Sequence, residues 1–376
     1  MRSLASEAAA PAQERIAPRA RRRILGRLDL VAVGLVAAAI GSTMVAALDD
    51  GGEPAPVIWI LVGALATYLV SSAISRRHRW AVPLLVLLAA GAVAVANADG
   101  LFERSPSLVP FGYAHHMWAF FLQAALAGGM LAVLKAPLPV RIGGAAVGMA
   151  FGLVAFGGSP LGPVAVTVVA AVALVLRRPG WVRAGIAAAG VLLLGVVVAS
   201  TVLGATYTGL ERWGSPNMLL EATSNRCDLE PGCSLYEARG FDRSLYRAVT
   251  ERRVALWHDA LILMRDHPLT GVGPGRFRAT SPLALGDPDE PWAHHEFLHQ
   301  GAETGVPGML LLLAIFAWPL YLLFRTADGA ALIVAAAVAA LGIHACLDYV
   351  LHFPAAPLAL AGLVGAAVRP APGGAR

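Results

Sequence analysis

Ten apolar stretches constrain the fold of this chain more than any other feature of its sequence. Each is 15 to 22 residues long, close to the roughly 20 residues that a helix needs to cross a bilayer. Only 14% of the residues are charged, whereas soluble domains carry about 25%. We therefore expect an all-α polytopic membrane protein with about ten transmembrane helices. The stretches lie at residues 28–48, 57–75, 80–97, 114–134, 140–157, 161–177, 182–203, 305–324, 329–347 and 354–368.

The connectors between these stretches alternate in charge. One set holds 18 of the 29 basic residues in short segments, and the positive-inside rule predicts that such segments lie in the cytoplasm. The other set, which includes the long connector 204–304, is then expected outside the plasma membrane. The net charge of +5 does not indicate nucleic-acid binding, because the basic residues lie in short runs between apolar stretches.

This topology predicts five parts in the chain, one of them a large extracytoplasmic loop that contains short helices. They are a cytosolic basic tail at 1–27, seven transmembrane helices in 28–203, the extracytoplasmic loop at 204–304, three transmembrane helices in 305–368, and a cytosolic tail at 369–376.

Two of the three cysteines lie close together in the long loop. Cys227 and Cys233 are six positions apart, with Pro231 and Gly232 turning the chain between them. Because a loop outside the cell is in an oxidising compartment, a disulfide between them is favoured over a thiol pair or a metal site.

The second half of the loop carries two helix patterns separated by turns. Residues 250–266 predict an amphipathic helix on the membrane surface, with Thr250 as its N-cap, and Pro268 ends it. Residues 271–275, Gly-Val-Gly-Pro-Gly, then predict tight turns. A second short helix is expected from His294 through Glu303.

Four arginines lie near these turns. Arginine binds phosphate through paired hydrogen bonds and stays charged when it is partly buried, so this group is a candidate site for the diphosphate of a lipid-linked sugar. Contacts with lipid head groups or ion pairs with nearby acids are the alternative. Gly273 and Gly275 are turn residues that would also let arginines approach a ligand. The arginines are Arg252, Arg253, Arg276 and Arg278.

The histidine-rich segment that follows permits two interpretations. His295-Glu296-x-x-His299 has the spacing of a zinc metallopeptidase motif, in which two histidines share one helix face, and only Glu303 is available nearby as a third ligand. Alternatively, His294 is an acid–base group, since the pKa of histidine near neutrality suits proton removal from a hydroxyl. Glu303 would then be a helix cap or the ion-pair partner of an arginine.

Two longer patterns connect these segments to a known family. They are R-V-A-L-W-x-x-A-L-x-x-x-x-x-H-P-L-T-G-V-G-P-G-x-F and A-H-x-E-F-L-x-x-x-A-E-T-G-V-P-G-x-L-L, within Arg253–Leu312. This region resembles the shared region of the O-antigen ligase and polysaccharide polymerase superfamily. His294 stands where that family has its catalytic histidine, His295 replaces the asparagine that follows, and Arg253 matches the family's arginine.

The resemblance implies a glycosyltransferase that needs no metal or other cofactor. Its donor would be an undecaprenyl-diphosphate-linked glycan, and its acceptor a glycan or lipid hydroxyl that His294 activates. Arg253 would act with it, and the substrate would be bound by Arg252, Arg276, Arg278, Gly273, Gly275, His295 and Glu303. A membrane zinc metallopeptidase and a non-enzymatic transporter of lipid-linked glycans remain as alternatives. A transporter is expected to carry ionisable residues within its spans, and these offer few beyond His344 and Asp348.

Overall fold

The structure, a computed structural model, is helical throughout its described regular elements. It describes residues 17–74, 76–98, 114–158, 179–206, 244–285 and 292–368. The α-helices are α1 (Ala17–Asp50), α2 (Ala55–Ala73), α3 (Ala81–Ala96), α4 (Ala114–Val133), α5 (Leu138–Gly158), α7 (Pro179–Ala205), α10 (Ser244–Asp266), α11 (Phe277–Thr280), α12 (Pro282–Leu285), α13 (Glu296–Thr326), α14 (Gly329–Ala345) and α15 (Ala355–Ala367). The 3₁₀ turns are η1 (Arg76–His78) and η2 (Val350–His352).

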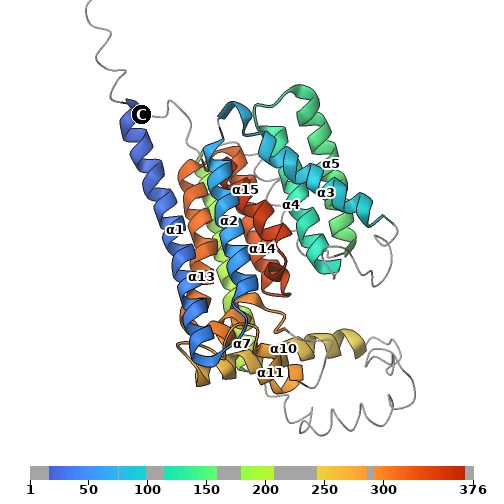
Figure 1. Cartoon of the computed structure of the whole chain (residues 1–376). Helices are drawn as coiled ribbons and strands as arrows, with labels where there is room; N and C mark the ends of the chain where they lie inside the picture. Colours follow the sequence, from blue (N-terminus) through green and yellow to red (C-terminus); the bar gives the residue numbers. More distant parts are fainter. Residues whose placement is uncertain are drawn as a thin grey trace, which may run out of the picture.

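The long helices form one bundle with two groups side by side (Figure 1). The first group is α1, α2, α7, α13, α14 and α15, in which α1 packs on α13 and α2 packs on α15. The second group is α3, α4 and α5, and α4 joins it to α14 and α15. Helices α10 and α11 lie across one end of the first group, at the end where α1 stops and α2 and α13 begin (Figure 1).

The prediction of an all-α membrane protein is confirmed in the described part of the chain, but ten spans are not. Nine of the ten predicted stretches coincide with helices, and the tenth, 161–177, lies outside the described residues. Six described helices are long and apolar enough to cross a membrane. Helices α3, α14 and α15 are apolar but shorter. The length of an apolar stretch in the sequence therefore did not distinguish helices long enough to cross a membrane from these shorter ones.

Burial explains why one of the shorter helices looks like a membrane span in sequence. Nearly every residue of α14 is buried, because α4, α7, α13 and α15 pack around it. A helix that is apolar on all sides is either enclosed by protein or surrounded by lipid. By contrast, α1, α2, α5 and α7 expose large apolar side chains, among them Leu30, Trp59, Leu153 and Val191, as lipid-facing helices do. The chain is a multi-pass membrane protein.

Two predicted helix starts differ from the structure. Thr250 is not an N-cap, because α10 already begins at Ser244, and the intervening residues contain neither glycine nor proline to stop the helix. His294 does not open the second helix either. Helix α13 begins at Glu296, with His295 as its N-cap, and continues beyond a break at Gly305, where φ is 73°.

Candidate functional site

His294 lies just before α13 in an unusual backbone conformation. Its φ is 50°, a left-handed value that residues other than glycine seldom adopt. The residue is 5% exposed. Such a backbone costs about 1–3 kcal/mol and persists only where surrounding contacts hold it, often at functional sites.

Asp348 and Arg253 meet His294 from two other parts of the chain. His294 Nδ1 lies 3.2 Å from Asp348 Oδ1, and Arg253 Nη2 lies 4.0 Å from Asp348 Oδ2. Asp348 sits between α14 and η2, where the Tyr349 amide donates a 2.9 Å hydrogen bond to its Oδ1. Arg253 comes from α10. The fold thus assembles an arginine, a carboxylate and an imidazole from three elements.

This arrangement suits acid–base chemistry at His294. A carboxylate beside Nδ1 favours the tautomer in which Nδ1 carries the proton and donates it to Asp348. The other nitrogen, Nε2, then has the lone pair that a general base needs. Arg253 balances the charge of Asp348 and keeps a cationic group close to the imidazole.

Aromatic side chains enclose the histidine. The ring of Tyr349 packs edge-on against His294 at a centroid distance of 4.9 Å, and Trp292 stacks on Tyr349 at 4.2 Å. Trp257 Nε1 donates a 3.4 Å hydrogen bond to the His294 carbonyl oxygen. These contacts fix both the ring and the backbone of His294.

His295 is fully buried and uses both ring nitrogens inside the protein. Its Nδ1 accepts a 3.3 Å hydrogen bond from the Leu298 amide and so caps α13. Its Nε2 lies 2.7 Å from the Ser200 hydroxyl on α7, and that hydroxyl is 2.7 Å from the carbonyl oxygen of Val196. Burial lowers the pKa of His295 to about 3, so the ring is neutral and ties α7 to α13.

Replacing His295 with alanine is expected to lower the free energy of unfolding by about 1–3 kcal/mol, since a helix cap and a buried hydrogen bond are both lost. His295→Asn is the matched comparison, because asparagine is itself a good N-cap and should recover part of the loss. Thermal unfolding of both variants in detergent measures the difference. An alanine variant as stable as the unmodified protein would contradict the capping role.

The H-E-x-x-H pattern does not form the arrangement of a zinc peptidase. His295 has extended backbone, with φ of −161°, and therefore does not share a helix face with His299. Glu296 Oε1 instead accepts a hydrogen bond from the Leu351 amide at 2.7 Å and lies 3.1 Å from His352 Nδ1. Among the described residues, no group of three or more His, Cys, Asp or Glu side chains is arranged to hold a metal ion.

Glu303 pairs with a histidine rather than with an arginine. Its Oε1 lies 3.4 Å from His299 Nε2 and accepts a 3.1 Å hydrogen bond from the Phe277 amide. The carboxylate is buried, and it holds α11 against α13. Among the described residues, the partner of Glu303 is therefore His299 and not an arginine, which was one of its two expected roles.

The glycines of the turn allow backbones to approach closely. Gly271, Gly273 and Gly275 have φ values of 67°, 96° and 75°, so the predicted tight turns are present. A Cβ atom on Gly273 would collide with the carbonyl oxygen of Gly51, and one on Gly271 with the backbone at Glu303. Gly271 and Gly273 thus serve contacts within the protein.

The same turn is joined to the connection between α1 and α2. The Glu53 amide donates a 2.8 Å hydrogen bond to the Pro274 carbonyl oxygen, and the Thr270 hydroxyl donates one of 2.9 Å to Asp49 Oδ2. The start of the chain therefore supports the segment that leads to the site.

The four predicted arginines do not all meet at His294. Arg253 contacts Asp348, whereas Arg276 Nη1 donates a hydrogen bond to the carbonyl oxygen of Asp50. Arg278 is exposed, and the side chain of Arg252 lies outside the described part of the structure. Cys227 and Cys233 also lie outside the described residues.

Comparison with known proteins finds one similar family. Residues 144–313 match the family model described as O-antigen ligase. This segment is similar to the O-antigen ligase family. No curated protein that was compared with the chain matches it. The O-antigen ligase match includes Arg253 and His294, and it indicates a membrane protein with a glycan-transferring function.

The O-antigen ligase motif does not reveal every residue of the site. Asp348 lies 54 positions from its histidine partner and beyond the matched residues. Ser200 is 95 positions from His295. One sequence signal for Asp348 is an ionisable residue at the end of an apolar stretch, which in membrane proteins points to function.

Proposed function

We propose that this protein transfers a glycan from an undecaprenyl-diphosphate-linked donor to a hydroxyl group of a glycan or lipid acceptor. The observation that carries the proposal is the contact of His294 with Asp348, next to Arg253. An imidazole that holds its proton on Nδ1 is ready to accept another on Nε2. A guanidinium group nearby is suited to a leaving group that bears phosphate charges.

In the proposed reaction, Nε2 of His294 takes the proton of the acceptor hydroxyl. The hydroxyl oxygen forms a bond to the anomeric carbon of the donor sugar, and the bond from that carbon to the phosphate oxygen breaks. Undecaprenyl diphosphate leaves with its negative charge paired to Arg253, and Arg252, Arg276 and Arg278 are proposed as further substrate-binding residues. Because a side chain acts as the base and guanidinium groups meet the charge, the reaction needs no metal ion.

The proposed reaction takes place at the outer face of the plasma membrane. Helix α1 ends, and α2 and α13 begin, at the end of the bundle that carries the site. The basic segments at η1 and Arg325 belong to the opposite ends of α2 and α13. The positive-inside rule puts those segments in the cytoplasm, which supports a site on the other side.

A reconstituted transfer assay tests the proposal. Purified protein in liposomes is given a lipid-linked oligosaccharide and candidate glycan or lipid acceptors, and both the transferred glycan and the released undecaprenyl diphosphate are measured. Transfer that persists in a chelator, with no stoichiometric zinc in the protein, is the expected result. Hydrolysis of peptides that depends on bound zinc would instead favour a metallopeptidase.

Asp348→Asn is expected to lower the transfer rate by about 10²–10⁴-fold, because the amide no longer holds His294 in its active tautomer as the carboxylate does. Substrate affinity should change little, since Asp348 is 2% exposed and its contacts are inside the protein. Separate measurement of kcat and KM checks this. An effect confined to KM would contradict the orienting role.

A further inference from the structure

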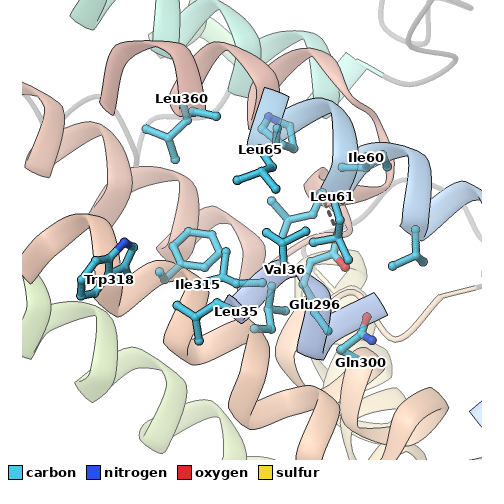
Figure 2. A pocket seen from close by; sticks show the side chains of 18 of the residues that line it. Leu35, Val36, Ile60, Leu61, Leu65, Glu296, Gln300, Ile315, Trp318 and Leu360 are labelled. Carbon is cyan, nitrogen blue, oxygen red and sulfur yellow. Dashed lines mark hydrogen bonds between the residues drawn. The ribbon is translucent and has the colours of Figure 1, made fainter. Parts of the chain in front are cut away.

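A cavity of about 240 Å³ lies inside the first group of helices, beside the proposed reaction site. Residues from α1, α2, α13, α14 and α15 line it, and Figure 2 shows their side chains pointing into the space between these helices. The lining residues on α13 extend from Glu296 to Leu322. The cavity is therefore elongated and follows the helices along the bundle.

Most of the cavity wall is apolar. Leu35 and Val36 of α1 face Leu61 and Leu65 of α2, and Leu360 of α15 closes the wall (Figure 2). An elongated space lined with aliphatic side chains fits a hydrocarbon chain, because each methylene group that leaves water makes binding more favourable.

One end of the cavity is polar and carries two carboxylates. The polar residues gathered at this end are Glu296, His299, Gln300, Glu303 and His352. The lining set of described residues contains no arginine or lysine. Burial alone would lower the pKa of His352, but the nearby carboxylates of Glu296 and Glu303 raise it above its usual value.

The charge balance at this end distinguishes between possible head groups. His352 pairs with Glu296 across 3.1 Å, so the positive charge on this imidazole is already matched by a carboxylate. A diphosphate would meet Glu303 and Glu296 without a free guanidinium or ammonium partner, which is unfavourable in a buried site. An uncharged head group with hydroxyls can instead hydrogen-bond to the carboxylates and to Gln300.

The polar end lies close to the proposed base. The ring of His352 is 6.2 Å from that of Tyr349, and Tyr349 packs against His294 at 4.9 Å. A chain held in the cavity thus has its head group about one aromatic ring away from His294.

From these observations we infer that the cavity binds the hydrocarbon chain of a lipid acceptor whose head group is uncharged and bears hydroxyls. The inference rests on the proposed glycan transfer, since it names the class of acceptor for that reaction. The donor diphosphate is then bound elsewhere, on the side of His294 where Arg253 contacts Asp348.

Photo-crosslinking with three probes of equal chain length tests the inference. The probes are a photoactivatable long-chain alcohol, the corresponding diphosphate and a phosphatidylcholine, each added to the full-length protein in nanodiscs. Two variants of α2 provide a matched pair: Leu61→Trp fills the cavity, whereas Val62→Trp changes the neighbouring residue, which is 41% exposed and does not line the cavity. Labelled residues are mapped by mass spectrometry.

The alcohol probe is expected to label α2, α13 and α15 in the unmodified protein and in Val62→Trp. Labelling should fall at least about tenfold in Leu61→Trp. The indole excludes part of the probe's chain from the cavity, and exclusion of about two methylene groups is enough for a tenfold loss of affinity. Unchanged labelling of Leu61→Trp would overturn the inference. Equal labelling by the diphosphate would identify a donor site instead, and equal labelling by phosphatidylcholine would indicate an ordinary lipid crevice.

The His294→Ala variant separates this inference from the proposed function. Because His294 does not line the cavity, the variant should bind the alcohol probe normally while losing transfer. Normal labelling of an unmodified protein that transfers no glycan would overturn the acceptor role and the proposed function together. Normal transfer without labelling would overturn the cavity site alone.

Discussion

Replacing His294 with alanine is expected to lower the rate of glycan transfer by about 10²–10⁴-fold, the contribution of a positioned acid–base group. The physical reason is the loss of the imidazole that contacts Asp348. The protein should still insert and fold, because the substitution does not change His295, which caps α13 and contacts Ser200. Transfer by the reconstituted protein, normalised to the amount inserted, measures the effect.

A second histidine serves as the control for this variant. His267 follows α10 and is exposed, so His267→Ala should transfer glycan at the normal rate. Near-normal transfer by His294→Ala would remove the proposed base and with it the mechanism. A variant that neither inserts nor elutes as a folded protein would be replaced by His294→Gln, which retains a polar side chain of similar length.

Replacing Arg253 with alanine is the change with the second largest expected effect. Removal of one group that stabilises developing charge typically lowers a reaction rate by about 10²–10³-fold. The Arg253 side chain is 28% exposed, so it contacts Asp348 and is also accessible to a charged leaving group. Arg253→Lys should retain part of the activity, since it keeps the charge but loses the planar pair of donors.

Another arginine on the same helix provides the comparison for Arg253. The side chain of Arg265 is 74% exposed and pairs with Asp266 across 2.9 Å, so Arg265→Ala should leave transfer unchanged. Equal losses for Arg253→Ala and Arg265→Ala would mean that α10 contributes only general positive charge. Equal rates for Arg253→Ala and the unmodified protein would exclude Arg253 from the reaction.

Hydropathy predicted the positions of the helices but not the role of each one. The stretch 182–203 and helix α7 (Pro179–Ala205) agree closely, because a long apolar run leaves little choice but a helix in a membrane protein. The stretch 329–347 also became a helix, α14, but its neighbours bury it. Apolar residues on every side look the same in sequence whether protein or lipid surrounds them.

Residues of the candidate site were predictable where a recognisable sequence motif contains them, and not where a residue outside the motifs reaches the site by folding. His294 and Arg253 belong to recognisable motifs, whereas Asp348 reaches His294 only through the packing of α14 and η2 around α13. The H-E-x-x-H pattern was misleading for a local reason. One residue, His295, takes the capping conformation instead of the helical one. The side chains of His295 and His299 therefore do not lie on the same helix face.

The hydrogen bonds between the Asp49–Glu53 connection and the turn at Thr270–Pro274 have a consequence for how this architecture can be divided. The segment that matches the family model begins at residue 144. Its turn at Thr270–Pro274 nevertheless packs on the connection between the first two helices, which lies about ninety residues before that boundary. Residues 144–313 are therefore not expected to fold correctly without the first two helices. A chimaera that joins this segment to the amino-terminal half of another protein must also keep the Asp49–Glu53 connection. Without it, the turn loses its hydrogen bonds to Asp49 and Glu53.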